Sequence, residues 1–168
     1  DVSISAIKGL IIKLGGLRLV AVHTPGHTPE HMSWAFYDDA RSKETPWLLF
    51  SGDFLFVGDV GRPDLLGEEA RKKLAHQLFD SVFTKLAPLP DYTEIFPAHG
   101  AGSLCGKAMS SRRSSTIGFE RRFNPSLKSM PEAQWIEKLL SGMPLAPPYF
   151  RRMKKMNAAG PPVLGNDQ

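Results

Sequence analysis

The sequence predicts a mixed fold of the α/β (α+β) class, and three observations support this. Short runs that alternate apolar and polar residues, typical of strands, are followed by segments with the longer period of an amphipathic helix. One continuous apolar run, WLLFSGDFLFVG, has the composition of a buried strand. Polar residues that suit chemistry follow several predicted strands, where folds of this class form their clefts.

The first part of the chain is predicted to consist of strands. Gly15-Gly16 forms a turn between two of them, and Gly52-Asp53 interrupts the apolar run. The polar loop DDARSKETP separates that run from the strand before it. The predicted strands cover residues 10–13, 17–23, 31–38 and 47–58.

Residues 67–86 are predicted to form a helix. His76 lies about 200° around this helix from Leu74, since each residue turns it by about 100°, so we predict an exposed position for His76. Apolar residues that recur at helical spacing would make the buried face, namely Leu74, Leu78, Val82 and Leu86 with Phe79 and Phe83 beside them.

The third quarter of the chain predicts a short strand and a second helix. TEIFPAH, residues 93–99, reads as a strand that stops at Pro97. A helix over residues 109–122 is consistent with the pattern, although the run SSRRSST weakens it.

A third helix is predicted to begin near Ser129. Ser129 and Glu132 have the spacing of a capping box, with a proline in the first turn. The helix is expected to stop at Gly142, and from Pro144 onward the frequent prolines and glycines predict an extended tail or linker. Its buried side would carry Trp135, Ile136, Leu139 and Leu140.

Length and composition indicate one globular domain or a piece of a larger one. Apolar residues make up 42% and charged residues 23% of the 168 residues, which is ordinary for such a domain. No run of about 18 apolar residues predicts a membrane span, and no basic segment followed by an apolar block predicts a signal peptide. The single cysteine, Cys105, fits a reducing compartment, so we expect a cytoplasmic location. We assign residues 1–145 to the domain and 146–168 to the tail.

The net charge of +4 comes largely from basic residues late in the chain. A basic surface can bind nucleic acid. Aromatic residues do not interleave with these charges as a stacking platform would require. We therefore predict a solvated face and no nucleic-acid partner for the residues concerned, which are Arg112, Arg113, Arg121, Arg122, Arg151, Arg152, Lys154 and Lys155.

The stretch HTPGHTPEH, residues 23–31, holds three histidines. His23 ends a predicted strand, where an isolated histidine is more often a hydrogen-bonded packing residue. His27 follows Pro25-Gly26 in a turn, where one ring nitrogen can point into a cleft while the backbone fixes the other, as a metal ligand requires. Pro29 stands between His27 and His31 and argues against a helical pair of ligands. We predict that His27 is a ligand and that His23 and His31 are scaffold.

Asp53 and His99 are further candidate ligands because each follows a predicted strand. A carboxylate at the end of a buried strand is costly unless it is paired, hydrogen-bonded or bound to metal; a turn-capping role is the alternative for Asp53. His99 lies in PAHGAG, before a glycine-rich loop, and a structural role is its alternative. Together with His27 they form a series of ligand types at strand ends, which is how metal sites collect their ligands.

Two more polar positions have an open role. Arg62, in the turn DVGRPD, would either clamp a substrate carboxylate with two hydrogen bonds or bridge Asp59 and Asp64 as a structural staple. Cys105, in the loop GAGSLCGK, would either face the cleft or fill a small buried position.

Several motifs in combination resemble the metallo-β-lactamase superfamily, namely TPGHTPEH, SGDFLFVGDVGRPDL, FPAHGAGSLCGK and SSTIGFERRFNP. Within it, they look most like bacterial persulfide dioxygenases, especially those fused to rhodanese domains. The resemblance extends over residues 17–125, and the tail motif MNAAGPP resembles the end of that catalytic domain before a rhodanese module. A fused or separate rhodanese domain is therefore an implied partner.

The resemblance implies an αββα sandwich with a mononuclear non-haem Fe(II) held by two histidines and one carboxylate, with positions left open for substrate and O₂. It makes His27 and Asp53 iron ligands. His99 matches the second-metal position of dinuclear relatives and would lie near the substrate, as would Arg62 and, from its loop, Cys105. The implied reaction converts glutathione persulfide, or a similar low-molecular-weight persulfide, with O₂ and water to sulfite and the thiol.

The sequence departs from the superfamily pattern in one respect, because no HxHxDH motif is present. The resemblance is therefore to the C-terminal half of the fold only. We expect that apolar surface is left exposed and that a homo-oligomer or a partner supplies the other half. Two other functions stay open, namely a zinc-dependent glyoxalase II-like thioesterase that uses His27, Asp53 and His99, and an inactive remnant without metal.

Overall fold

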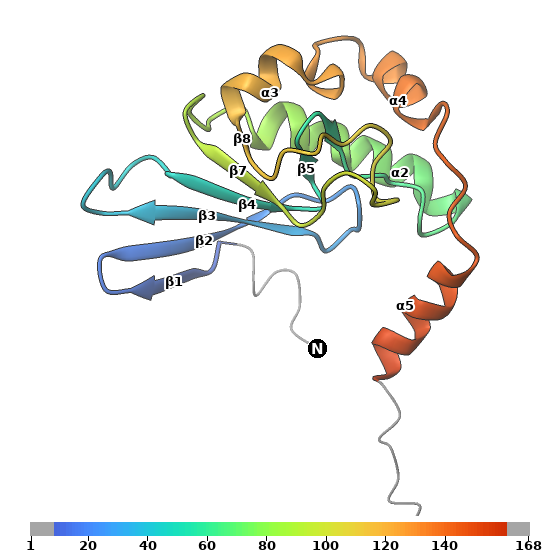
Figure 1. Cartoon of the computed structure of the whole chain (residues 1–168), viewed down its shortest axis with the longest axis horizontal. Helices are drawn as coiled ribbons and strands as arrows, with labels where there is room; N and C mark the ends of the chain where they lie inside the picture. Colours follow the sequence, from blue (N-terminus) through green and yellow to red (C-terminus); the bar gives the residue numbers. More distant parts are fainter. Residues whose placement is uncertain (1–8, 161–168) are drawn as a thin grey trace, which may run out of the picture.

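The computed structural model describes residues 9–160 and contains a six-stranded sheet with helices (Figure 1). The strand order is β1-β2-β3-β4-β7-β8, and only the β4–β7 pair is parallel. Because β4 and β7 are parallel, both strands end at the same edge of the sheet, and the residues that follow them lie close together. The strands of this sheet are β1 (Ile11–Leu14), β2 (Leu17–His23), β3 (Met32–Asp38), β4 (Leu48–Gly52), β7 (Glu94–Pro97) and β8 (Ser115–Thr116).

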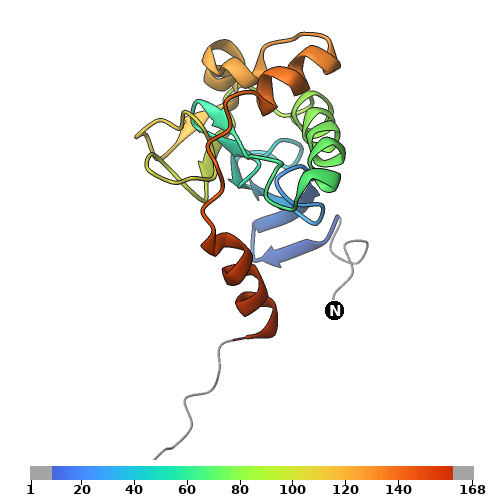
Figure 2. The ribbon, with the colours of Figure 1, turned by 90° about the vertical axis from the view of Figure 1, so that its right-hand side faces the viewer.

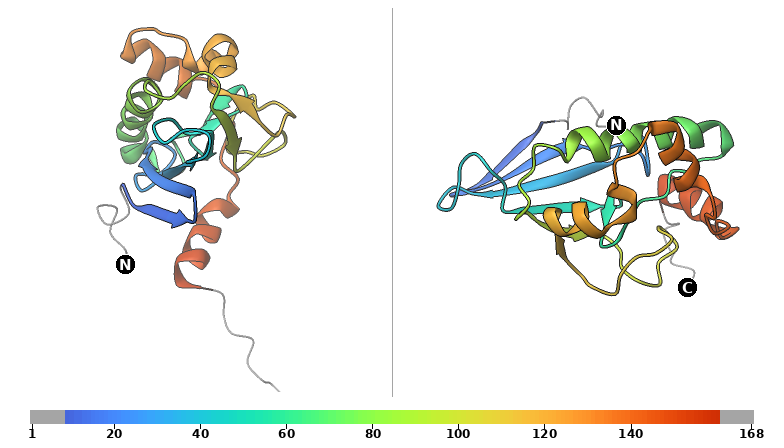
Figure 3. Two further views of the ribbon diagram at one scale, coloured as in Figure 1. Left: turned by 90° about the vertical axis from the view of Figure 1, so that its left-hand side faces the viewer. Right: turned by 90° about the horizontal axis from the view of Figure 1, so that it is seen from above.

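A small two-stranded sheet and several helices complete the described chain. Figures 1 and 3 show α2, α3 and α4 together on one side of the large sheet, whereas Figure 2 shows α5 apart from them. None of the helices described between residues 9 and 160 is long and apolar enough to cross a membrane. The remaining elements are β5 (Leu55–Phe56), β6 (Asp59–Val60), α2 (Glu68–Asp80), a π-helical turn (Ser81–Lys85), α3 (Ile117–Phe123), a 3-10 turn (Pro125–Leu127), α4 (Glu132–Leu140) and α5 (Tyr149–Ala159).

The main core lies between the large sheet and α2. Ala35, Leu49 and Ile95 are register partners on β3, β4 and β7, and all three are buried. They pack in one cluster with Leu74 and Leu78 of α2, as the helical spacing predicted. Burying one leucine side chain contributes about 1.5–3 kcal/mol, so this layer fixes the end of β4 where the polar residues follow.

The opposite face of the large sheet carries a row of aromatic side chains, at positions that alternate with the buried core residues. Trp34 pairs with Phe50 across β3 and β4, and Phe50 pairs with Phe96 across β4 and β7. Phe36 and Phe96 each contact Phe50, with ring centroids 6.4 and 6.1 Å away. Phe50 is 40% exposed, so this face of the sheet presents apolar surface to solvent.

The predicted mixed α+β class is confirmed, and three local predictions are wrong. The segment expected to be helical over 109–122 is a loop until β8, because serines compete for backbone hydrogen bonds, and only Ile117–Phe123 is helical. The capping box is not formed, since Pro131 in an extended conformation precedes the helix. The tail expected to be extended contains α5, whose sequence between Pro148 and Gly160 lacks both helix breakers. Residues 161–168 of that tail lie outside the described residues.

Candidate functional site

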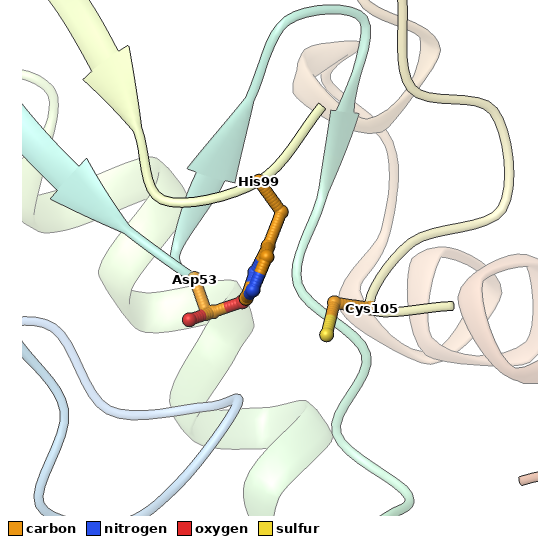
Figure 4. Close-up of side chains that lie close together, drawn as sticks. All are labelled: Asp53, His99 and Cys105. Atoms are coloured by element: carbon orange, nitrogen blue, oxygen red, sulfur yellow. The ribbon is translucent and has the colours of Figure 1, made fainter. Parts of the chain in front are cut away.

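Three side chains from three segments meet at the edge of the sheet where β4 and β7 end. The Nδ1 atom of His99 lies 2.6 Å from Oδ1 of Asp53, and Cys105 approaches this pair from the following loop (Figure 4). One ligand atom from each residue lies within 4.8 Å of the other two. Within residues 9–160, these residues form a group of histidine, cysteine and carboxylate side chains that can hold a metal ion. A backbone hydrogen bond from Ala98 to Gly52, 3.0 Å long, holds the two strand ends together.

The position of Asp53 depends on Gly52 and His31. Gly52 has a φ of +58°, which only glycine adopts readily. A Cβ atom at Gly52 would lie 2.6 Å from Nε2 of His31, which is too close for a real contact. That Nε2 atom accepts a hydrogen bond of 3.0 Å from the backbone N–H of Asp53. His31 therefore holds the turn that directs the Asp53 carboxylate toward His99.

His31 begins a chain of hydrogen bonds that runs from the turn between β2 and β3 through β3 to β4. Because Nε2 accepts, Nδ1 carries the ring proton and donates to Oγ1 of Thr24 at 2.9 Å. Thr24 contacts Ser33 at 2.8 Å, and Ser33 donates to the carbonyl of Ser51 at 3.3 Å. Burial, and then the charge of His27, lower the pKa of His31 to about 4, so the neutral ring that the chain requires is the form present at neutral pH.

His27 has the ring orientation that was predicted for a ligand. Ser81 donates to the Pro25 carbonyl at 2.7 Å, and Gly26 packs so closely on Leu78 that a Cβ would lie 2.5 Å from the Leu78 Cβ. The turn is thereby fixed on α2. Nδ1 of His27 lies 2.9 Å from the Arg62 carbonyl, which can only accept, so Nδ1 carries the proton and Nε2 keeps its lone pair.

His27 does not join the group of Asp53, His99 and Cys105. Gly61 lies between the two parts of the site, since a Cβ there would overlap the Asp53 carbonyl oxygen at 1.8 Å and touch the His27 Cβ at 3.2 Å. Only glycine fits this position. The binding of a metal by His27 and Asp53 stays a prediction, and the structure places the two residues on either side of one glycine.

Arg62 has a structural role and not the predicted contact with a substrate. Its side chain is buried, and its guanidinium donates two hydrogen bonds of 2.7 Å to the Asp64 carboxylate. Further donors bind the carbonyls of Leu104 and Pro144 at 3.1 and 2.6 Å. The alternative of a staple is thus partly right, but Asp59 is not its second partner. Because Arg62 also donates its backbone N–H to the Cys105 carbonyl, it positions the cysteine loop.

Asp59 holds the same loop from the other side. Its Oδ2 atom accepts hydrogen bonds from the backbone N–H groups of Lys107 and Ala108 at 2.6 and 2.9 Å.

Desolvation by burial, and also the Asp53 carboxylate, raise the pKa of the Cys105 thiol above its ordinary value. In the absence of a metal, Cys105 is therefore a protonated thiol at neutral pH.

The sequence predictions for His23 and His76 are confirmed. His23 donates from Nε2 to the Pro29 carbonyl at 2.8 Å and is scaffold. His76 is exposed and pairs with Glu132 at 2.8 Å. Sequence reasoning missed the hydrogen bond from Asp53 to His31 and the role of Asp59 as an acceptor for loop amides. The sequence carried only part of this information. An aspartate in a buried turn predicts hydrogen bonds to backbone N–H groups, but it does not identify which residues supply them.

A cavity of about 390 Å³ lies beside His27. The turn after β2 contributes Thr28 and Glu30, and one face of α5 contributes Phe150, Met153 and Asn157. The cavity is bounded in addition by Leu65 and Leu66. A small amphipathic molecule would fit there with one end at the imidazole.

Two solved structures resemble this chain in fold. The chain superposes on a metallo-β-lactamase from Staphylococcus aureus subsp. aureus COL with a TM-score of 0.80 and 43% identity, over 89% of this chain and 42% of that one. It superposes on ETHE1 from Myxococcus xanthus with a TM-score of 0.69 and 26% identity, over 90% and 57% of the two chains. The chain has the metallo-β-lactamase fold, and these likenesses support the metallo-β-lactamase superfamily as its class.

A relative with a functional name points to metallo-hydrolases within that class. The hydroxyacylglutathione hydrolase GloC of Haemophilus influenzae is 34% identical over 122 residues, which are 73% of this chain and 46% of that protein. A comparison with protein-family models finds no match. The chain spans less than half the length of the first relatives that it matches, so the activity of a whole protein is a proposal for this chain.

Proposed function

We propose that the chain carries part of the active site of an Fe(II)-dependent persulfide dioxygenase. Its substrate would be glutathione persulfide or a similar low-molecular-weight persulfide. The observation that carries this proposal is the Cys105 thiol beside the Asp53–His99 pair, because a protonated thiol at that place can donate a hydrogen bond to the sulfur of a persulfide. The likeness in fold to ETHE1 from Myxococcus xanthus supports the same choice.

The donor atoms of the site fit such a metal in part. Nε2 of His27 keeps a free lone pair because Nδ1 is engaged by the Arg62 carbonyl, and the Asp53 carboxylate supplies the oxygen donor of a two-histidine, one-carboxylate site. Fe(II) would supply the redox chemistry that allows O₂ to react with a persulfide. The second histidine would come from a companion segment or another copy of the chain, in keeping with the missing HxHxDH motif.

The chain's own residues bind and orient the substrate. The thiol carrier would occupy the cavity beside His27, with its apolar part against Phe150 and Met153. The persulfide end would lie near Cys105, whose protonated thiol can donate a hydrogen bond to sulfur. His99 fixes the Asp53 carboxylate through their 2.6 Å contact. With O₂ and water, the persulfide would give sulfite and the free thiol.

The proposal is tested by measuring O₂ uptake and sulfite formation with glutathione persulfide, on the chain purified anaerobically and supplied with Fe(II). We expect iron-dependent O₂ uptake that His27→Ala abolishes and that His76→Ala, an exposed histidine outside the site, leaves unchanged. The absence of iron-dependent O₂ uptake, with or without a companion half added, would overturn the proposal.

A zinc-dependent thioester hydrolase is the second candidate, favoured by the 34% identity to GloC. In that case His27, Asp53 and His99 would hold zinc and activate water. The same preparations loaded with Zn²⁺ would then hydrolyse S-lactoylglutathione and consume no O₂ with the persulfide. A chain that binds neither metal and shows neither activity would be the inactive remnant.

A further inference from the structure

The cavity of about 390 Å³ beside His27 has an apolar wall and one carboxylate. Glu30 supplies the carboxylate, and it is the one acidic side chain among the described residues that line the cavity. A molecule that binds here can gain both from the burial of apolar surface and from a positive charge placed near Glu30. The apolar wall is formed by Leu65, Leu66, Phe150 and Met153.

The Glu30 carboxylate is available to a ligand. Glu30 is exposed in the turn after β2, and no ion pair joins it to any side chain that the structure describes. The neighbouring His31 ring does not neutralise it, because burial and the charge of His27 lower the pKa of His31 to about 4. At neutral pH the negative charge of Glu30 therefore remains uncompensated by this ring.

The turn that carries Glu30 is held in place by hydrogen bonds. The Pro29 carbonyl accepts a hydrogen bond of 2.8 Å from His23. The Thr28 carbonyl accepts from two backbone N–H groups of the same turn, at 3.1 and 3.4 Å. Because His27 and Glu30 stand on this one turn, the imidazole and the carboxylate keep their relative positions. A ligand bound at Glu30 loses little entropy through reordering of the protein.

A carboxylate at the wall of an apolar cavity favours a ligand that carries an ammonium group, since charge-assisted hydrogen bonds are stronger than neutral ones. Glutathione carries such a group at its γ-glutamyl end. We propose that Glu30 binds the ammonium group of the thiol carrier and thereby determines specificity for persulfides of amine-bearing thiols. The inference rests on the proposed function, because it takes the cavity beside His27 as the place where the thiol carrier binds.

Calorimetric titration of the metal-free full chain measures this recognition without any turnover. The two probes are glutathione and glutaryl-cysteinylglycine, which is the same tripeptide with hydrogen in place of its ammonium group. We expect glutathione to bind about 3–5-fold more tightly, the effect of an ion pair at a solvent-exposed position. The difference should shrink at an ionic strength of about 1 M, where the screening length falls to about 3 Å.

Matched variants assign the difference to Glu30. Glu30→Gln should remove it, whereas Glu30→Asp keeps the charge and should retain part of it. Glu69→Gln changes an exposed glutamate that is not among the described lining residues, so it should bind both probes like the wild type. Met153→Ser should weaken both probes alike, because it alters the apolar wall and not the charge. The ratio of the two affinities within one variant does not respond to a general loss of folded protein.

Three results would overturn the inference, namely equal affinities of the two probes for the wild type, a preference that persists in Glu30→Gln, and no binding of either probe. Oxygen uptake separates this inference from the proposed function. If glutathione is preferred but its persulfide gives no iron-dependent O₂ uptake, the ammonium site stands and the proposed function falls. If the persulfides of both tripeptides are oxidised with equal kcat/KM and the probes bind equally, the proposed function stands and the role of Glu30 falls.

Discussion

At the scale of single residues, the Arg62–Asp64 pair gives the most direct prediction. Arg62 is almost completely buried and bonds Asp64 through two contacts of 2.7 Å. Breaking a buried ion pair by removing one charge typically costs about 3–5 kcal/mol. Asp64→Asn should lower the free energy of unfolding in urea by about 3 kcal/mol. Asp80→Asn, which breaks the more exposed contact to Lys85, should cost less than about 1 kcal/mol. Equal losses in the two variants would contradict a structural role for Arg62.

The same pair predicts a dependence of stability on pH. Burial alone would raise the pKa of Asp64, but the hydrogen bond and charge of Arg62 outweigh this and hold it below its ordinary value of 3.8. A carboxyl group with a lowered pKa stabilises the fold above that ordinary value and loses this contribution as the pH falls through the folded value. Urea unfolding should therefore show the difference between wild type and Asp64→Asn shrinking below about pH 4. A difference that stays constant down to pH 2 would count against it.

The sequence indicated which residues lie near the site more readily than it indicated which residues they contact. His27 was predicted to have one nitrogen fixed by the backbone, and it has. Arg62 was expected near the substrate or between two aspartates, and it pairs with one aspartate and two distant carbonyls. The carbonyl of Pro144 comes from a part of the chain far from Arg62 in sequence, and local patterns hold no information about such contacts.

At the scale of elements, the end of β4 depends on glycine. Gly52 and Gly15 have nearly the same φ, +58° and +61°, but only at Gly52 would a Cβ meet a neighbour, the His31 ring at 2.6 Å. A non-glycine residue in this conformation costs about 1–2 kcal/mol. Gly15→Ala should thus lower the free energy of unfolding by about 1 kcal/mol and Gly52→Ala by about 3 kcal/mol. Comparable values from thermal or urea unfolding would show that His31 moves aside without cost.

The buried hydrogen bonds between the strands predict a role for His31 in metal binding. His31→Leu would leave the Asp53 N–H without its acceptor, at a cost of about 1–3 kcal/mol, and would free the turn that carries Asp53. Because Asp53 is a ligand in the proposed function, we expect this variant to bind Co²⁺, used as a probe for Fe(II), about 10–100-fold more weakly, the usual effect of removing a contact that supports a ligand. His31→Gln keeps an acceptor at the same reach and should recover most of the affinity. Calorimetric titration measures both, and equal affinities for Leu and Gln would contradict a positioning role.

Elements were predicted well where periodicity was strong and poorly where it was not. The apolar spacing from Leu74 to Leu86 located α2 and its π-helical continuation. The tail was expected to be extended because its prolines and glycines were counted together. In the structure they flank α5 at Pro148 and Gly160 and delimit it. Composition averaged over a segment conceals this arrangement, whereas position along the chain shows it.

At the scale of the whole molecule, the large sheet has two different faces. One face packs on α2 through Ala35, Leu49 and Ile95. The other carries the aromatic row of Trp34, Phe36, Phe50 and Phe96 described above, with Phe50 40% exposed. The continuous apolar run in residues 47–58 predicted a buried strand, but the sequence could not show which face of the sheet the chain itself covers. Since sheets with two apolar faces are normally covered on both, we propose that the exposed row is a surface for association.

This surface predicts concentration-dependent self-association of the isolated chain. Phe50→Glu should reduce the association, because a charge in an apolar interface must be desolvated, while costing little stability at a site already 40% exposed. Leu145→Glu, at a position 96% exposed, is the matched control and should associate like the wild type. Sedimentation velocity over a range of concentrations distinguishes the three proteins. A wild-type chain that stays monomeric at all concentrations would contradict the prediction. If Phe50→Glu alone is monomeric, the aromatic row is the surface against which a second copy or a companion half of the fold packs.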